Sequence, residues 1–416
     1  MRDRRSNATD GGLTRRQALG ALASAGTVAV AGCNVGPLGG GVDPLWEQTL
    51  SDASGTAPPA ATDSHVLVGT QDRSAYALDV ESGERAFDVT TGGPIETRPA
   101  VPESGGPYHV HSTDGDLYAV SAAGERLWHE EGTHRRASIG RTGSLLVDVD
   151  WHTETVRGLD AASGATRFER TARVYPFPAL TESTALFPVS TGDERYRLTA
   201  FDAADGTVRW ATDPDSTPPY YAVTGELVVT VSEAGVRARH LDDGSVRWET
   251  TLDRDVYSYF GRPIWFGRDV YLQTDRDDEP DELVALDRAD GTVRWSRSAG
   301  YELEDVAATD EAVYVASSVN DPDGGILVRV DAFGPDGDRR WRTTTDLQIG
   351  GTVASFGRVG DVVFAASDRA VTALDSASGE RRWRYDPEGR LHVRAAGDAL
   401  FATARDGGRV ARLPVE

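Results

Sequence analysis

The sequence predicts an all-β fold of repeated four-stranded units, and three observations support this prediction. An aromatic residue recurs nine times along the 416-residue chain, at intervals of about 40 residues. A glycine precedes eight of these nine aromatic residues by four positions. Each interval holds four short apolar runs separated by turn residues, which is the strand spacing of a propeller blade. We therefore expect a β-propeller, in which each unit buries its apolar surface against its neighbours.

The repeated aromatic residues and glycines mark equivalent positions in successive units. The aromatic residues are Trp46, Phe87, Trp128, Phe168, Trp210, Trp248, Trp295, Trp341 and Trp383. The glycines are Gly83, Gly124, Gly164, Gly206, Gly244, Gly291, Gly337 and Gly379. We interpret this series as a structural frame, in which each large aromatic side chain packs against the neighbouring blade.

The unit that ends at Trp295 displays its four expected strands most clearly. They cover residues 262–265, 269–272, 283–286 and 292–295. In other units the second run is continuously apolar. Such a run fits a strand that is buried on both faces between stacked blades.

An aspartate stands four residues before the glycine in five units. These residues are Asp79, Asp160, Asp202, Asp287 and Asp375. An aspartate here can accept backbone N–H bonds within the turn, while the glycine takes a positive φ without steric cost. A ring of catalytic carboxylates is the alternative, but the local turn role explains the constant spacing better. Three turns depart from the pattern, at His240, at Ser121 and at residues 331–337.

The pattern Ala-Leu-Asp-x-x-x-Gly-x-x-x-Trp at 285–295 and 373–383 resembles the repeat of the PQQ-like (quinoprotein-like) propellers. The resemblance covers the chain from about residue 45 to the end. That family includes quinoprotein alcohol dehydrogenases and BamB-like lipoproteins of outer-membrane assembly. It implies an all-β propeller of four-stranded blades, eight by the family norm.

The sequence itself contains nine units, the last one divided between the chain ends. Three apolar runs at 391–393, 400–402 and 409–413 follow the eighth unit without an aromatic fourth run. The unpaired run at residues 45–47, which contains Trp46, supplies the missing strand. A blade built from both ends closes the ring and removes open sheet edges.

Charge and composition exclude one class of partner. The formal net charge is -23, the pI is about 4.7, and all 43 basic residues are arginine. A chain this acidic repels phosphate backbones, so we expect no nucleic-acid binding. The arginine-only, aspartate-rich composition resembles that of proteins from halophilic archaea, in which high salt screens the self-repulsion.

The N-terminus predicts export and lipidation. A basic segment with Arg15 and Arg16 resembles a twin-arginine signal, and an apolar run of residues 18–32 ends at Cys33, the only cysteine. The residues before Cys33 resemble a lipobox; a signal peptide with an incidental cysteine is the alternative. We therefore divide the chain into a signal peptide (1–32), a Gly-rich tether (33–44) and the propeller (45–416). The anchored protein would lie on the outer face of the cytoplasmic membrane.

We assign no catalytic, cofactor-binding or metal-binding residue from the sequence. The adjacent cysteine pair typical of quinoprotein dehydrogenases is missing after Cys33, and their calcium ligands match no position, so PQQ and Ca²⁺ are disfavoured. His109 and His111 alternate on one strand, but a surface pair is a better interpretation than a metal site. Acidic hairpins at 275–282 and 320–325 could bind Ca²⁺, but we interpret them as solvated loops.

A candidate ligand face lies where the chain enters the innermost strands of the third to sixth units. Its residues are Arg135, Arg136, Tyr175, Phe177, Tyr220, Tyr221, Tyr257, Tyr259 and Trp265. Aromatic side chains with two arginines suit a peptide or glycan, because they give a large contact area at low entropy cost. Packing between blades is the alternative interpretation of these residues.

These observations favour a monomeric, non-catalytic scaffold that binds a protein or glycan partner at the cell envelope and meets the membrane only through its lipid. The alternative is a PQQ-dependent oxidoreductase, or another enzyme that uses the central channel. The outer-membrane role of BamB is not carried over, because a halophilic archaeon would lack that membrane.

Overall fold

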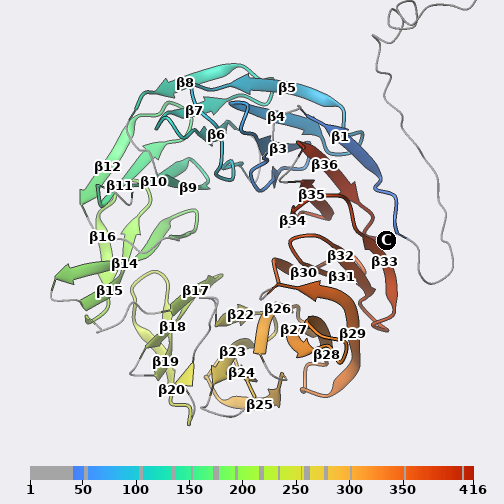
Figure 1. Ribbon diagram of the computed structural model, residues 1–416. Coiled ribbons are helices and arrows are strands. Elements are labelled where there is room, and N and C mark those ends of the chain that lie inside the picture. Colours follow the sequence, from blue (N-terminus) through green and yellow to red (C-terminus); the bar gives the residue numbers. More distant parts are fainter. Residues whose placement is uncertain are drawn as a thin grey trace, which may run out of the picture.

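The computed structural model describes residues 41–50, 55–102, 106–132, 137–150, 153–171, 178–192, 195–214, 220–232, 235–253, 255–256, 263–275, 280–299, 302–350, 353–404 and 407–416. Within these residues the secondary structure is all β, and nine small antiparallel sheets follow one another around a ring (Figure 1). The predicted β-propeller is confirmed. We number its sheets as blades 1 to 9 in chain order.

Blades 1 to 3 contain β2 (Ala60–Ala61), β3 (His65–Gly69), β4 (Ser74–Asp79), β5 (Arg85–Thr90), β6 (Tyr108–His111), β7 (Leu117–Val120), β8 (Arg126–Glu130), β9 (Ala137–Thr142), β10 (Leu145–Asp150), β11 (Thr155–Asp160) and β12 (Thr166–Thr171). Blades 4 to 6 contain β13 (Ala179–Leu180), β14 (Thr184–Gly192), β15 (Arg195–Asp202), β16 (Val208–Ala211), β17 (Tyr220–Thr224), β18 (Leu227–Ser232), β19 (Gly235–His240), β20 (Val246–Thr250), β21 (Asp255–Val256), β22 (Ile264–Phe266), β23 (Val270–Asp275), β24 (Glu282–Leu286) and β25 (Val293–Ser298). Blades 7 to 9 contain β26 (Glu302–Ala308), β27 (Val313–Asn320), β28 (Ile326–Phe333), β29 (Arg339–Ile349), β30 (Ser355–Val359), β31 (Val362–Ala366), β32 (Val371–Asp375), β33 (Arg381–Tyr385), β34 (Leu391–Ala396), β35 (Ala399–Ala404), β36 (Arg409–Leu413) and β1 (Trp46–Thr49).

Each regular blade is a meander of four neighbouring strands, with the first strand nearest the ring axis and the fourth at the rim. Figure 1 shows β9, β17 and β34 on the inside and β5, β12 and β33 on the outside. Two blades are irregular. In blade 2 the first strand is reduced to an isolated bridge between Ala100 and His109, and in blade 6 the short strand β21 also pairs with β23.

The ring is closed by a blade that both chain ends build. Strand β1 pairs antiparallel with β36, with Trp46 opposite Arg412 and Thr49 opposite Arg409. The sheet order is β1-β36-β35-β34, so the predicted split blade is confirmed. The ring has nine blades, as the unit count indicates, and not the eight of the family norm, because the divided ninth unit forms a sheet of its own.

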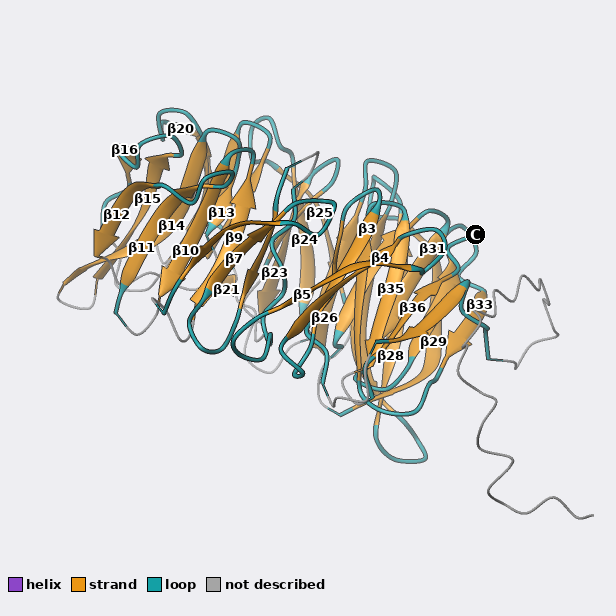
Figure 2. Cartoon of the chain, turned by 90° about the horizontal axis from the view of Figure 1, so that it is seen from above, coloured by secondary structure: helices purple, strands orange, loops and turns teal. Residues whose placement is uncertain are grey.

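The apolar core is distributed between the blades. Second strands are buried along their length, as in β31, where all five residues are buried. One cluster joins β30–β33 to β34–β36, and another joins blade 5 to blade 6. Figure 2 shows successive sheets stacked side by side, with turns at both ends of the strands. Each blade therefore depends on its neighbours for burial of its apolar surface.

Candidate functional site

The aspartate of the turn between the third and fourth strands accepts hydrogen bonds from the turn itself and from the fourth strand. In blade 8, Oδ1 of Asp375 accepts the backbone N–H groups of Ala377 and Ser378 at 3.0 and 2.8 Å. Oδ2 of Asp375 accepts a hydrogen bond from Arg382 at 2.6 Å. The bond from Arg382 and those from Ser378 lower the pKa of Asp375 to about 2. This carboxylate stabilises its turn.

The same carboxylate–arginine contact recurs in four blades, always across seven positions. The pairs are Asp160–Arg167 at 2.6 Å, Asp202–Arg209 at 2.7 Å, Asp287–Arg294 at 3.2 Å and Asp375–Arg382 at 2.6 Å. Bonds from Ser163 and then Arg167 lower the pKa of Asp160 to about 2. These carboxylates form ion pairs and accept hydrogen bonds within their own turns, which agrees with the turn interpretation.

The tryptophan of one blade is tied to the turn of the next blade. The indole N–H donates to a backbone carbonyl of that turn in six cases: Trp46 to Val80, Trp128 to Ala161, Trp210 to Leu241, Trp248 to Arg288, Trp295 to Pro335 and Trp341 to Ser376. The turn glycine also has a positive φ, and a Cβ on it would clash with the aromatic ring, as at Gly291 beside Trp248. The recurrent residues therefore form the frame of the ring.

Three residues of the candidate ligand face lie in the described part of the chain, and all three are half-buried on innermost strands. Tyr220 and Tyr221 are on β17, and Trp265 is on β22. The Tyr221 hydroxyl donates to the Leu186 carbonyl of blade 4 at 3.2 Å, and burial raises the pKa of Tyr221. The Trp265 indole donates to Oδ1 of Asp305 in blade 7 at 3.0 Å.

These three side chains thus contact apolar clusters between blades, as the packing alternative requires. They come from neighbouring blades on one arc of the ring. The other six residues of the set, Arg135, Arg136, Tyr175, Phe177, Tyr257 and Tyr259, lie outside the described residues. The ligand face as a whole stays a prediction.

A polar network in blade 2 was not expected from the sequence. Asp116 accepts hydrogen bonds from His129 at 2.9 Å, from the Gly132 N–H at 2.6 Å and from the Tyr118 hydroxyl at 3.1 Å. The Tyr118 hydroxyl in turn accepts the Gly92 N–H at 3.1 Å. Burial opposes ionisation of Asp116, but the bonds from His129, Gly132 and Tyr118 outweigh it and lower its pKa.

This network joins the chain segments that enter and leave blade 2, at Gly92 and Gly132. A tyrosine at the same place in the third strand of blade 1, Tyr76, donates to Asp72 at 2.8 Å. The sequence signal was therefore available, as a tyrosine near a hairpin aspartate in two successive units. The network orders backbone segments beside the unit that carries Arg135 and Arg136.

The histidine pair of blade 2 is buried, which corrects the surface interpretation. His109 has no exposed area, and His111 is 4% exposed. Nε2 of His109 bonds the Ala161 carbonyl of blade 3 at 2.8 Å. Burial lowers the pKa of His109 to about 4, so the ring is neutral at pH 7. The sequence could not show this, because both neighbouring blades are needed to cover the strand.

The described residues contain no group of three or more His, Cys, Asp or Glu side chains placed to hold a metal ion. In the acidic hairpin of blade 7, Asp321 accepts hydrogen bonds from the Asp323 N–H and from Gln348. In that of blade 6, Asp281 accepts bonds from Gln273 and the Leu303 N–H. Residues 276–279 of the latter hairpin lie outside the described part.

The described segments include no helix of the length and apolarity that a membrane crossing needs. Arg15, Arg16 and Cys33, on which the export and lipidation predictions depend, lie outside these segments.

Known proteins share the repeat and the ring. A family model described as outer membrane protein assembly factor BamB matches residues 40–173, 151–258 and 323–414. No curated protein sequence matches the chain at a significant level.

Many solved structures resemble the chain, among them two natural proteins and one designed protein, and at their low sequence identities the likeness is one of fold. BamB from Moraxella catarrhalis is 18% identical, with a TM-score of 0.52, and the match covers 89% of this chain and 97% of that one. The computationally designed protein Ika8 is 12% identical, with a TM-score of 0.53 and coverage of 76% and 95%. Quinohemoprotein alcohol dehydrogenase from Comamonas testosteroni is 12% identical, with a TM-score of 0.51 and coverage of 89% and 76%.

Proposed function

The chain belongs to the propeller family described as outer membrane protein assembly factor BamB, and on this premise we propose that it is a non-catalytic, protein-binding scaffold of the cell envelope. The observation that supports the proposal is that the recurrent residues of the repeat serve the framework of the ring. The recurrent aspartates, arginines and tryptophans are bonded within turns or between adjacent blades. The surface available to a partner is therefore formed by the residues that differ from unit to unit.

The entry segments of the innermost strands in blades 3 to 6 are the best candidate for that surface. They carry the aromatic and arginine residues of the candidate ligand face, and a protein or glycan is the partner that such side chains suit. Tyr220 is a described member of this set, half-buried on the innermost strand of blade 5.

Export and lipidation complete the proposal. The first described residues lie against the rim of the ring, where the Val42 N–H donates to the Arg384 carbonyl of β33 at 2.8 Å and Gly41 forms a parallel bridge to Arg384. A lipid on Cys33 would thus hold the propeller by the rim of blade 8. Because Gly41 and Val42 are already bonded to the rim, the seven residues 34–40 form the free tether. Such a Gly-rich segment has an average span of roughly 15 Å, enough to keep the ring off the outer face of the cytoplasmic membrane.

Partner capture tests the scaffold. Crosslinking and pulldown from native membranes at high salt should recover a protein with wild type and less of it with Tyr220→Ala. Val246→Ala is the matched control, because Val246 is 47% exposed on the outermost strand of the same blade. Equal capture by both variants would reject the inner face as the binding surface. Unfolding of Tyr220→Ala would favour the packing interpretation of that residue.

Two further measurements separate the parts of the proposal. A labelled lipid should be incorporated into wild type and not into Cys33→Ala; label retained in the variant would reject lipidation at Cys33. Addition of PQQ with Ca²⁺ should produce neither a visible absorption band nor a rise in Tm. A saturable band would favour the oxidoreductase alternative instead.

A further inference from the structure

The Glu304 carboxyl group lies between blades 7 and 8, and only one of its two oxygen atoms accepts a hydrogen bond from the described chain. It lies on the innermost strand β26, at a break in the pairing register between Leu303 and Asp305, and it is 7% exposed. Its Oε2 accepts the Val353 N–H at 3.2 Å. Its Oε1 is buried and has no hydrogen-bond partner within the described chain. A β-bulge is a common way to redirect one side chain of a strand.

Val353 belongs to the start of the inner part of blade 8. It packs on the apolar cluster that blades 7 and 8 share, and the neighbouring Ala354 N–H donates to the Ala366 carbonyl at 2.8 Å. The bond from Val353 to Glu304 therefore ties the entry of β30 to β26. This hydrogen bond is a polar link between blades 7 and 8.

The surroundings of Glu304 favour its neutral form. Glu302 and Asp305 on the same strand are carboxylates that oppose a second negative charge, and β27 contributes the Ser318 hydroxyl, which lies 3.5 Å from Glu302. Blade 8 contributes the Val353 N–H. Burial first, and then Glu302 and Asp305, raise the pKa of Glu304 to about 7, although the Val353 N–H and the nearby Ser318 hydroxyl act in the opposite direction.

We propose that Glu304 is a proton-controlled latch that holds the entry of blade 8 against blade 7. When Glu304 is protonated, its carboxyl group fits the buried site without a counter-ion. When it loses the proton, the site holds an unpaired buried charge, and hydration of that charge favours release of Val353 from β26. The latch concerns the ring itself and does not depend on whether the inner face binds a partner.

The sign of the pH effect follows from the raised pKa. A carboxyl group whose pKa is raised by folding contributes stability below its unfolded pKa, and this contribution is lost as the pH rises through the folded pKa. Opening of the junction releases one proton between these two values. The opening constant should therefore rise about tenfold per pH unit from about pH 5 to about pH 7 and level off above it.

Amide hydrogen exchange of the full chain, corrected for the intrinsic effect of pH, measures this opening at Val353, whose N–H bonds Glu304. The Ala354 N–H, which bonds Ala366 within blade 8, is the internal reference. Wild type should lose protection about tenfold per pH unit below pH 7, while Glu304→Gln should show no such slope. Glu302→Gln is the companion variant, because Glu302 is exposed and its charge raises the pKa of Glu304. It should keep the slope but reach the plateau at a lower pH.

A slope that persists unchanged in Glu304→Gln, or a flat profile in wild type, would overturn the latch. If Glu304→Gln fails to fold, infrared titration of the wild type replaces it. The protonated carboxyl C=O band should disappear with a midpoint near pH 7 in wild type and at a lower pH in Glu302→Gln. A midpoint that Glu302→Gln does not move would contradict the assignment.

Discussion

Trp248 and Trp383 occupy equivalent positions in the repeat but have different neighbours. Trp248 lies at the junction of blades 5 and 6, and Trp383 lies at the junction of blades 8 and 9. At the first, the Trp248 indole donates to the Arg288 carbonyl at 3.0 Å, and its ring covers Gly291. At the second, Trp383 is equally buried, at 7% exposure, but its Nε1 has no hydrogen-bond partner in the described chain. The third and fourth strands of blade 9 come from opposite chain ends, so no turn connects them.

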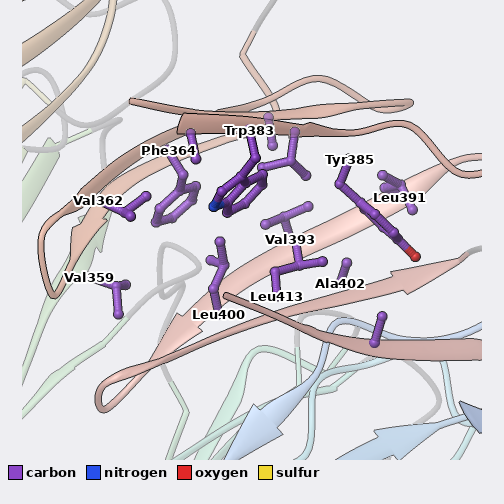
Figure 3. Close-up of a cluster of buried hydrophobic side chains, with 14 of the residues drawn as sticks. Val359, Val362, Phe364, Trp383, Tyr385, Leu391, Val393, Leu400, Ala402 and Leu413 are labelled. Atoms are coloured by element: carbon purple, nitrogen blue, oxygen red, sulfur yellow. The ribbon is translucent and has the colours of Figure 1, made fainter. Parts of the chain in front are cut away.

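The comparison separates apolar packing from the turn frame. At the closing junction Trp383 still packs between Phe364 of blade 8 and Val393 of blade 9 (Figure 3). The divided blade cannot provide the turn carbonyl that accepts the indole N–H at six other junctions, nor the turn glycine on which the aromatic ring packs. Contacts of the N-terminal segment compensate, among them the bond from Tyr385 to Glu47 at 3.1 Å.

Removal of β1 should have the largest effect, because it takes away both the fourth strand and its tryptophan. A variant that lacks residues 1–49 exposes the edge of β36 and the cluster around Phe401, on which Trp46 packs. We expect association or loss of cooperative unfolding, measured by sedimentation and circular dichroism. A variant that lacks residues 1–40 is the control. A monomeric 1–49 deletion with unchanged Tm would contradict the role of β1.

Gly291→Ala should destabilise a regular junction strongly. Gly291 has φ +76°, and an added Cβ would lie 2.5 Å from the Trp248 ring. Gly397→Ala is the matched control, since Gly397 has φ +58° but no atom within 4 Å of such a Cβ. We expect a loss of about 3 kcal/mol or more for Gly291→Ala and about 1 kcal/mol for the control, by denaturant unfolding. Equal losses would show that backbone strain alone explains the recurrence of glycine at this turn position.

Phe substitution of the two tryptophans should distinguish the junctions by about 1 kcal/mol. Trp248→Phe removes a bonded indole N–H and leaves the Arg288 carbonyl without its donor. Trp383→Phe removes an N–H that is already unpaired and buried. Both changes remove a similar ring area, so Trp248→Phe should be the more harmful in denaturant titrations. A larger loss for Trp383→Phe would mean that its N–H has a partner.

The smallest effect concerns acid stability of the turns. The pKa of Asp375 is lowered to about 2 by the bonds from Arg382 and Ser378, so its contribution is present above its ordinary pKa and is lost as the pH falls toward 2. Asp375→Asn should remove less than about 1 kcal/mol at pH 7, because the ion pair is partly exposed, and much less at pH 2. Unfolding measured at both pH values checks this. A loss that is independent of pH would point to turn geometry instead of charge.

Much of the fold could be predicted because the repeat encodes it locally. The turn residues around Asp375, the aromatic frame and the split of the ninth unit all follow from spacing along the chain. The protonation-sensitive and polar interior could not be predicted in the same way. His109 is buried because blade 3 offers the Ala161 carbonyl, and Glu304 is buried because blade 8 covers it. Such burial depends on which neighbour faces a strand, and no local pattern records that.

The candidate site was predicted only as a set of residues at equivalent places in successive units. The structure shows Tyr221 and Trp265 bonded to adjacent blades, so side chains of one type serve both packing and surface roles. The Asp116 network was missed because its members lie on two strands and on a connection. A search for a tyrosine that follows a hairpin aspartate, as in Tyr76 and Tyr118, would have found it.

A disulfide across the closing blade tests the central claim, that the two chain ends form one sheet. Thr49 and Arg409 lie directly opposite each other on β1 and β36, at a separation that a disulfide can span. In a Cys33→Ser background, Thr49→Cys with Arg409→Cys should form an intramolecular disulfide readily and raise the Tm. Thr49→Cys with Val246→Cys, on the far side of the ring (Figure 1), should not. Failure of the first pair to crosslink in the folded monomer would contradict the closed nine-bladed ring.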